Sequence, residues 1–260
     1  MPNSPWQQRI RRAENLSAHH AFAAEILGFY VQIARFQQNF YGRLRAASQM
    51  PSAIGTSISD PRLLASFPDF LTVVETHGPQ SLAEVADKLR GSERAWPGLL
   101  NGLWSGADAP LTPEEFLAFA FLQPYAEFAR ESERLQIDGY TGSLCPLCHR
   151  KPAGGVLRPM GDGGRRSLLC GFCLTEWEFR RIICAGCGEE EPGKLPVYTA
   201  AEMPHIRVEC CDTCHGYIKS IDFTKNGLAD PLVDELASIP LNLWAQERGY
   251  TKLHPNLLGM

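Results

Sequence analysis

Apolar side chains in the first half of the chain recur every three or four residues, the spacing of a single helix face. Residues 10–44 carry the longest such run, and alanines fill many of the positions between its aromatic and aliphatic residues. We therefore predict one long helix over residues 10–44, whose apolar face packs into a core. Its apolar positions are Ile26, Phe29, Tyr30, Ile33, Phe36 and Phe40.

Helix-start signals divide the rest of this half. Asp60 and Thr112 each precede a proline at the first helical position, where a backbone N–H is not needed. Two pairs have the spacing of a capping box: Thr112 with Glu115, and Ser81 with Glu84. These signals predict an all-α bundle of four to six helices.

Three prolines fall inside predicted helices, where the missing N–H and the ring clash favour a bend or a break. They are Pro68, Pro124 and Pro240. Apolar residues continue beyond Pro124 as far as Leu135. Pro240 lies in the last predicted helix, which Asp230 caps and which precedes a tail from residue 248 onward.

The second half of the chain has short apolar segments separated by turn residues, which predicts strands. Residues 161–164, Gly-Asp-Gly-Gly, have the composition of a hairpin turn. We expect the order knuckle, hairpin, knuckle twice over, as in an internal duplication. The expected strands are residues 155–158, 166–169, 177–183, 195–198, 206–209 and 217–223.

Eight of the nine cysteines form four Cys-x-x-Cys pairs, the strongest chemical signal in the chain. Two thiolates separated by two residues can point inward around one tight turn, and two such turns supply the four ligands of a tetrahedral metal site. We therefore predict two metal sites, with Cys210 outside them as a buried small residue or a spare ligand. The predicted ligands are Cys145, Cys148, Cys170, Cys173, Cys184, Cys187, Cys211 and Cys214.

Spacing favours sequential pairing of the four motifs. The first and second motifs, and the third and fourth, are separated by roughly twenty residues, close to the spacing of zinc ribbons. A site shared by the two middle pairs stays open, although the gap between Cys173 and Cys184 is short for a ribbon. His149 and His215 each follow a motif directly, but four sulfurs already fill each tetrahedron.

Disulfide bonds are the main alternative use of paired cysteines, and they need an oxidising compartment. The N-terminal residues carry charges without a following apolar segment, so we predict no secretory signal. No apolar run reaches the roughly 18 residues of a membrane span. We therefore expect a protein of the reducing cytoplasm, without membrane insertion, whose thiolates bind metal.

Three further segments accompany the four cysteine pairs: residues 123–127 (Gln-Pro-Tyr-Ala-Glu), residues 173–177 (Cys-Leu-Thr-Glu-Trp) and an ending that contains residues 234–238 (Asp-Glu-Leu-Ala-Ser), 247–250 (Glu-Arg-Gly-Tyr) and Pro255-Asn256. Together they resemble the formate dehydrogenase accessory protein family, FdhE, over nearly the whole chain. The resemblance implies a helical domain joined to two rubredoxin-like modules, with iron at the cysteines. It also implies a cytoplasmic protein that acts on the catalytic subunit of respiratory formate dehydrogenase during maturation. By position, metal ligation carries over to the eight cysteines of the four pairs.

The expected fold is α+β and multidomain. We predict an all-α bundle at residues 1–138, rubredoxin-like or zinc-ribbon modules at 139–180 and 181–225, and a C-terminal helix and tail at 226–260. Modules this small bury too little apolar surface to fold alone, so bound metal should contribute to their folding. Spacing alone favours zinc, the resemblance favours rubredoxin-type iron, and tetrahedral sulfur ligation suits both.

Two functional hypotheses follow, and a third is weaker. The first is a non-enzymatic assembly factor that binds the catalytic subunit of formate dehydrogenase, alone or as a homo-oligomer. The second is a zinc-ribbon nucleic-acid-binding protein, which the net charge of −4 disfavours. The third, a thiol–disulfide enzyme, is incompatible with metal on all four pairs. The second hypothesis depends on the basic residues Arg150, Lys151, Arg158, Arg165, Arg166, Arg180 and Arg181.

Overall fold

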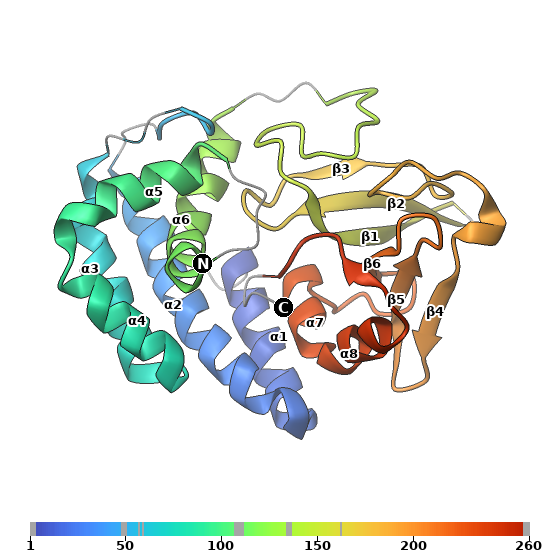
Figure 1. Ribbon diagram of the computed structural model, residues 1–260, viewed down its shortest axis with the longest axis horizontal. Helices are drawn as coiled ribbons and strands as arrows, with labels where there is room; N and C mark the ends of the chain where they lie inside the picture. The colour runs from blue at the N-terminus through green and yellow to red at the C-terminus, as the bar shows by residue number, and fades with distance from the viewer. Residues whose placement is uncertain are drawn as a thin grey trace.

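The structure is a computed structural model that describes residues 4–47, 51–56, 58, 60–106, 112–133, 137–161 and 163–256. Six α-helices form one half of the described chain, and a mixed sheet with two further helices forms the other (Figure 1). The predicted α+β order is confirmed. None of the described helices has both the length and the apolarity of a membrane span. Leu135, the expected end of the apolar run beyond Pro124, lies outside the described residues.

The helical half is built around α6 (Pro113–Ser132), which is buried along most of its length and contacts α2, α4 and α5. The Phe121 ring of α6 lies 4.8 Å from the ring of Phe67 and 5.3 Å from that of Phe40, between centroids. Burial of these rings is a major stabilising term for the bundle. The other elements are α1 (Pro5–His19), α2 (Ala24–Ala46), α3 (Pro61–His77), α4 (Gln80–Arg90), α5 (Trp96–Trp104) and the 3₁₀ turns η1 (Ala21–Ala23) and η2 (Glu93–Ala95).

The predicted single helix over residues 10–44 is wrong, because the chain reverses at His20. This residue is extended (φ −126°, ψ 91°), and its N–H donates to the carbonyl of Leu16 at the end of α1. Helices α1 and α2 then pack as an antiparallel hairpin, with the Trp6 and Tyr41 ring centroids 6.0 Å apart at its open end. The apolar spacing continues across the turn without a glycine or proline, so the pattern conceals the break.

Most of the predicted helix starts are confirmed. Asp60 accepts a hydrogen bond from the backbone of its own helix, and Thr112 and Glu115 form both bonds of the capping box, at 3.2 and 2.9 Å. The capping box predicted at Ser81 is wrong. Helix α4 already begins one residue earlier and has no side-chain cap.

The three prolines predicted to bend helices differ in their effect. Helices α3 and α6 continue through Pro68 and Pro124. The predicted single last helix is wrong, because the chain forms α7 (Pro231–Ala237) and α8 (Ile239–Glu247) instead. Pro240 lies in the first turn of α8, where its missing N–H is tolerated.

One sheet runs through both cysteine-bearing segments, in the order β3-β2-β1-β6-β5-β4, with β7 beside β6. The parallel neighbours β1 and β6 join the two segments, and Gly155 of β1 lies opposite Ser220 of β6. An added Cβ at Gly155 would lie 2.1 Å from the Ser220 hydroxyl and 3.1 Å from its Cβ, so any larger residue would displace the Ser220 side chain. The strands are β1 (Pro152–Met160), β2 (Gly163–Cys170), β3 (Glu176–Glu178), β4 (Val197–Ala200), β5 (Met203–Cys210), β6 (Gly216–Asp222) and β7 (Thr251–Lys252); a 3₁₀ turn, η3 (Pro192–Lys194), precedes β4.

Four predicted strands are confirmed within or overlapping β1, β2, β5 and β6, namely residues 155–158, 166–169, 206–209 and 217–223. The strand expected at 177–183 is wrong beyond residue 178, since the chain turns there toward the third cysteine motif. The strand expected at 195–198 begins two residues later. The predicted turn at 161–164 joins β1 and β2, and Asp162 lies outside the described residues. The module boundary between residues 180 and 181 stays a prediction. Strands from both sides of this boundary belong to the same sheet.

The described residues form two apolar cores. The larger one extends without interruption from the helical bundle to the first four cysteines. The smaller one lies between β5, β6 and α8 and includes Val208, Ile221 and Ala245. The first two cysteine motifs therefore share their core with the helices.

A buried lysine fixes the break between α7 and α8. The Lys219 ammonium donates to the Glu235 carbonyl at 2.7 Å and to the Ser238 hydroxyl at 2.8 Å, and it pairs with the Glu235 carboxylate at 2.9 Å. Burial lowers the pKa of Lys219 to about 8, although Glu235 opposes this shift. A cation at this position satisfies the last carbonyls of α7 and interacts favourably with the helix dipole.

Asp234 of α7 connects three distant parts of the chain. Its carboxylate accepts two hydrogen bonds from the Arg12 guanidinium of α1, at 2.9 and 2.5 Å. It also lies 2.7 Å from Nε2 of His205 on β5. The Asp234 side chain is only 1% exposed, so this network ties the N-terminal helix to the C-terminal helices and the sheet in a buried setting.

We predict that Asp234→Asn lowers the free energy of unfolding at pH 7 by about 3 kcal/mol, because it leaves a largely buried guanidinium without its carboxylate. Burial opposes ionisation of Asp234, but hydrogen bonds from His205 and Arg12 lower its pKa below the ordinary 3.8. The stabilisation by the carboxylate is therefore present above pH 3.8 and is lost as the pH falls through the lower pKa of the folded state.

Urea unfolding curves of the wild type and the variant should differ at pH 7 and converge below about pH 4. The matched control is Arg35→Gln, which removes the exposed ion pair between Arg35 and Glu14. We expect it to cost less than about 1 kcal/mol. Equal losses in the two variants would contradict the assignment.

Candidate metal centre

The structure gathers the eight paired cysteines into two groups of four, each with its sulfur atoms within 4.8 Å of one another. The predicted sequential pairing is confirmed, and a site shared by the middle motifs is excluded. The first cluster is Cys145, Cys148, Cys170 and Cys173; the second is Cys184, Cys187, Cys211 and Cys214.

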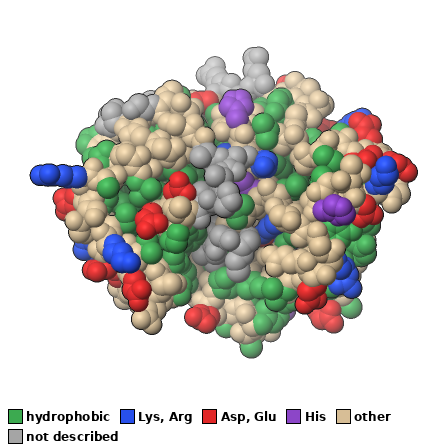
Figure 2. All heavy atoms as spheres, in the orientation of Figure 1, with side chains coloured by type: hydrophobic (Ala, Val, Ile, Leu, Met, Phe, Trp, Pro, Cys, Tyr) green, Lys and Arg blue, Asp and Glu red, His purple; other side chains and the backbone are tan. Residues whose placement is uncertain are grey.

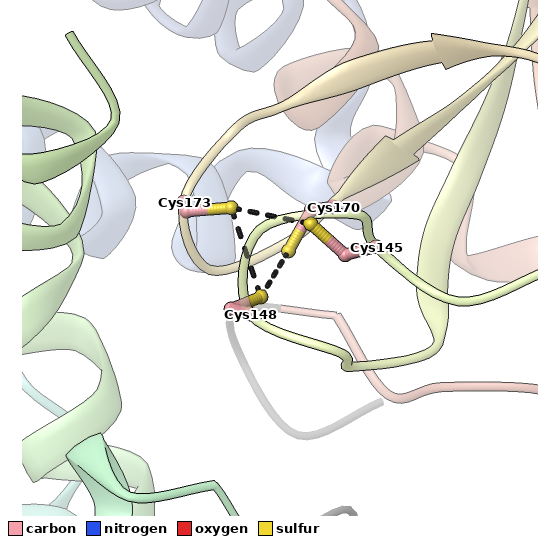
Figure 3. A group of neighbouring side chains, drawn as sticks. All are labelled: Cys145, Cys148, Cys170 and Cys173. Atoms are coloured by element: carbon pink, nitrogen blue, oxygen red, sulfur yellow. Dashed lines mark hydrogen bonds between the residues drawn. The ribbon is translucent and has the colours of Figure 1, made fainter. Parts of the chain in front are cut away.

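The sulfur–sulfur distances fit a tetrahedral metal site. In the first cluster, Sγ of Cys148 lies 3.4 Å from Sγ of Cys170 and 3.7 Å from Sγ of Cys173, and Cys145 lies 3.5 Å from Cys173 (Figure 3). Metal–sulfur bonds of about 2.3 Å place the sulfurs of a tetrahedron about 3.8 Å apart. A disulfide needs about 2.05 Å. The first cluster therefore has the spacing of a metal site.

The second cluster has the same spacing. Sγ of Cys184 lies 3.7 Å from Sγ of Cys214, and Sγ of Cys187 lies 3.7 Å from Sγ of Cys211. As in the first cluster, these contacts join sulfurs of different motifs, which closes one tetrahedron between two turns. All nine cysteines of the chain are free thiols in the structure.

The four motifs adopt one repeated turn. In each, the N–H of the first cysteine donates to the carbonyl five residues later, at 2.8–2.9 Å. The residue after the second cysteine has a positive φ in every copy, between 54° and 79°. Only one of these four positions is a glycine, so three copies hold a side chain in a conformation that costs about 1 kcal/mol. The positions are His149, Leu174, Gly188 and His215.

Backbone N–H groups within the turns donate to sulfur, as the spacing of the motifs predicts. The N–H of Phe172 lies 3.4 Å from Sγ of Cys170, and that of Gly186 lies 3.3 Å from Sγ of Cys184. Such bonds favour the thiolate form that a metal requires. His149 and His215 belong to neither cluster.

The first cluster is buried, and burial changes how readily its thiols lose their protons. Hydrogen bonds among the thiols lower the pKa of Cys148, whereas burial raises the pKa of Cys170 and Cys173 well above the usual range. Four buried thiols cannot all lose their protons unless a cation neutralises the resulting thiolates. The donor set therefore fits a divalent ion that exchanges for the protons.

The second motif inserts its tip into the helical bundle. The Phe172 ring is fully buried, 5.1 Å from the ring of Phe119 and 5.8 Å from that of Trp104. The Arg150 guanidinium lies 4.0 Å from the centroid of the Phe172 ring and donates to the carbonyl of Leu103 in α5. Residues beside the sulfurs thus pack directly against α5 and α6.

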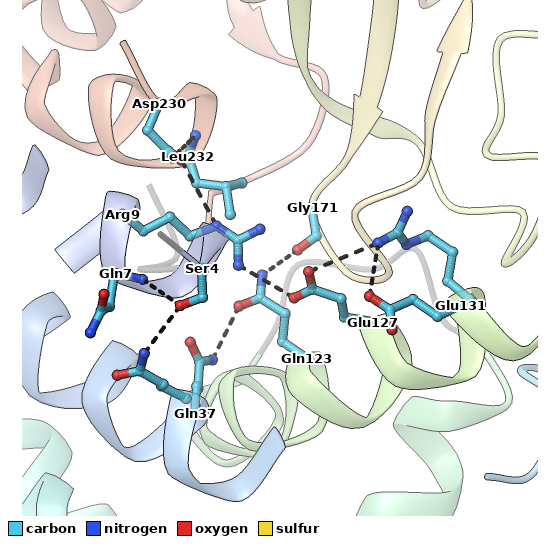
Figure 4. A network of polar contacts seen from close by, with 12 residues as sticks. Ser4, Gln7, Arg9, Gln37, Gln123, Glu127, Glu131, Gly171, Asp230 and Leu232 are labelled. Carbon is cyan, nitrogen blue, oxygen red and sulfur yellow. Dashed lines mark hydrogen bonds and ion pairs between the residues drawn. The ribbon is translucent and has the colours of Figure 1, made fainter. Parts of the chain in front are cut away.

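A chain of buried amides makes the same connection (Figure 4). Gln37 of α2 donates to Oε1 of Gln123 in α6 at 3.1 Å. Gln123 then donates to the carbonyl of Gly171, inside the second motif, at 2.7 Å. Both glutamines are at most 1% exposed, so each needs its partners. Gln123 lies in one of the segments that carry the family resemblance, but no local sequence pattern predicts this contact.

The second cluster lies at the surface. Cys187 and Cys214 are exposed, whereas Cys184 and Cys211 are 7% and 1% exposed. The C-terminal strand β7 lies beside it, and Leu253 Cδ2 would lie 2.6 Å from a Cβ added at Gly216. A set of four cysteines therefore occurs twice in the structure, once in the core and once at the surface.

Cys210 is separate from both clusters. Its side chain is 3% exposed and belongs to the smaller apolar core. Burial and the nearby Asp212 carboxylate raise the pKa of Cys210 to about 12, so the thiol stays protonated at neutral pH. Of the two alternatives, the structure supports a buried small residue.

Family models match the cysteine-bearing half. One, described as the FdhE central domain, matches residues 144–181, and one described as the FdhE C-terminal domain matches residues 182–258. The chain belongs to the FdhE family. It is 28% identical over 247 residues to the protein FdhE homolog of Aquifex aeolicus, covering 94% of this chain and 85% of that protein.

FdhE homologs of two pseudomonads are also similar. The Pseudomonas aeruginosa protein is 32% identical over 68% of this chain, and the Pseudomonas putida protein is 33% identical over 71%. These alignments span 59% and 60% of the length of those relatives. A crystal structure of FdhE from P. aeruginosa has the same fold, with a TM-score of 0.71 and 24% identity over 97% of this chain and 94% of that one.

We predict that Phe172→Ala lowers the free energy of unfolding of this FdhE family member by about 3–5 kcal/mol, because it opens a cavity between the second motif and the helices. Thr213→Ala is the matched control, since Thr213 has the same place in the fourth motif but is exposed. Its cost should stay below about 1 kcal/mol. Phe172→Leu, at an intermediate cost, tests the claim if the alanine variant does not fold. Equal stability of all variants in urea unfolding would refute it.

We predict that a chelator empties the two sites at different rates. Loaded with Zn²⁺ or Fe²⁺, the chain should release one equivalent rapidly from the exposed second cluster, and the other only as the core opens. A colorimetric chelator measures both phases. In Cys214→Ser the rapid phase should disappear while the slow phase remains. A single rate for both equivalents, or a variant that loses the slow phase instead, would contradict the assignment.

Proposed function

We propose that this chain is a non-enzymatic accessory factor for the maturation of respiratory formate dehydrogenase. In this proposal it binds the catalytic subunit of that enzyme in the cytoplasm, through a β-sheet head stabilised by one metal ion at each four-cysteine cluster. Membership of the FdhE family supports the partner. The nine free thiols support a reducing compartment.

The observation that carries the proposal is the pair of four-sulfur clusters within one sheet. Each cluster closes two turns against each other, so an ion there would stiffen the surface around it. All eight ligands would then be engaged, and a ligated thiolate is not free to attack a disulfide. A binding role agrees with this arrangement better than thiol–disulfide chemistry does.

The identity of the metal follows from the donor set only in part. Four thiolates at tetrahedral spacing suit zinc and rubredoxin-type iron equally well. Iron would add one-electron chemistry, and zinc would serve as a scaffold alone. Thiolate-to-iron absorption in the visible range, together with elemental analysis, distinguishes the two.

The structure argues against the alternative hypothesis of nucleic-acid binding, which depends on exposed basic residues. Most of the basic residues on which it depended are engaged by carboxylates. Arg158 pairs with Glu176 at 2.7 Å, and Arg166 pairs with Glu209 at 2.6 Å while its side chain is 4% exposed. Acidic and basic side chains are interspersed over the face shown in Figure 2, without a continuous basic stripe. A phosphate backbone would find few available guanidinium groups there.

We predict that Cys211→Ala abolishes complementation of a strain that lacks the chromosomal gene, while Cys210→Ala preserves it. The two cysteines are adjacent, but only Cys211 belongs to a cluster. The first variant should also lose one equivalent of metal, because three thiolates hold an ion less well than four. Formate-dependent respiration and elemental analysis measure the two effects.

Capture of the catalytic subunit by the tagged chain tests the partner directly. The wild type and Cys210→Ala should retain the subunit, and Cys211→Ala should not. Unchanged formate-dependent respiration in the deletion strain would refute the proposed function. Loss of complementation in Cys211→Ala with metal and subunit capture intact would show that the sulfur has a chemical role instead.

A further inference from the structure

A groove lies next to the second cluster, between the segment at residues 181–185, the segment at 192–197 and the strands β5 and β6. Its volume is about 340 Å³, and Cys184 forms part of its wall. The groove is close to β4, the outermost strand on this side of the sheet (Figure 1). Anything bound there would lie beside the exposed metal site.

The apolar lining of the groove is unusually open to solvent. Ile182 is 58% exposed and Val197 is 44% exposed, and Leu195 lies in the same wall. Val197 starts β4, and among the strands that the structure describes β4 pairs with β5 alone. The free edge offers backbone N–H and C=O groups to an added strand. These features suit an extended segment with an aliphatic side chain.

Two guanidinium groups give the groove a positive charge. Arg181 and Arg207 line both this groove and an adjoining cavity of about 580 Å³. Among the described residues, no hydrogen bond from either guanidinium is found, and the carboxylate nearest to Arg207, that of Glu209, is 3.9 Å away. Arg166 already engages Glu209 at 2.6 Å. The groove lining thus carries three arginines, Arg166 among them, against the single carboxylate of Glu209, in a chain whose net charge is −4.

We propose that this groove binds an extended acidic segment of the formate dehydrogenase catalytic subunit. Its aliphatic side chain would occupy the space between Ile182 and Val197, and its carboxylates would pair with Arg181 and Arg207. This inference rests on the proposed function and specifies the contact. The charge pairs would determine which segment binds, and the apolar contact would supply most of the affinity.

The test uses overlapping peptides that cover the catalytic subunit, together with the full-length subunit. The full chain should bind a peptide that combines carboxylates with aliphatic residues, and salt should weaken the binding. Arg181→Glu combined with Arg207→Glu should raise its Kd at least about tenfold. The charge-matched control combines Arg94→Glu with Arg165→Glu, two exposed arginines outside the groove. It should leave the Kd unchanged.

The apolar contact has its own pair of variants. Ile182→Asp should raise the Kd of the peptide at least about tenfold. Leu228→Asp, at an 85% exposed position outside the groove, should leave the Kd unchanged. Equal capture of the subunit by the wild type and all groove variants would overturn the groove assignment and leave the proposed function standing. If the wild type captures no subunit at all, the proposed function fails and the inference fails with it.

Discussion

The burial of four sulfur atoms between a helical bundle and a sheet is the constraint on which the rest of the structure depends. Thiols in that place cannot all ionise unless a cation is present, so the first cluster couples metal binding to the packing of the largest core. Phe172 and Gly171 lie between two of the ligands, and both contact the helices directly. The helical half and the sheet are therefore coupled energetically, although their sequence patterns differ completely.

The two clusters have the same set of four cysteines but different surroundings. Both use the same turn, with the same hydrogen bond from the first cysteine. Their surroundings differ, because the second motif carries a phenylalanine that inserts into the core and the fourth carries an exposed threonine at the same place. An ion in the buried cluster would mainly stabilise the fold, whereas an ion in the exposed cluster would be accessible to a partner, a chelator or an electron donor.

Local features of the fold could be predicted from sequence, and features that depend on distant contacts could not. The spacing of the cysteines determines the turns and their sequential pairing, and Thr112 with Glu115 determines a helix start within four residues. The reversal at His20 depends on how α1 packs against α2, which its own residues do not signal. The break at Ser238 likewise depends on Lys219, which lies in strand β6. The contact of Gln123 with Gly171 joins residues far apart in the chain, so no local pattern predicts it.

The continuity of the sheet explains why the first cluster also matters for the surface around the second. Arg166 belongs to β2, which ends in the first cluster, yet its guanidinium donates to the carbonyl of Arg180 at 2.8 Å and pairs with Glu209 of β5. These bonds position the segment that leads into Cys184. Because Arg166 is almost fully buried, displacement of β2 would leave a charge without its partners and would move that segment. Arg166 thus links the strand that ends in the buried cluster to the segment that enters the exposed one, although the two clusters share no ligand.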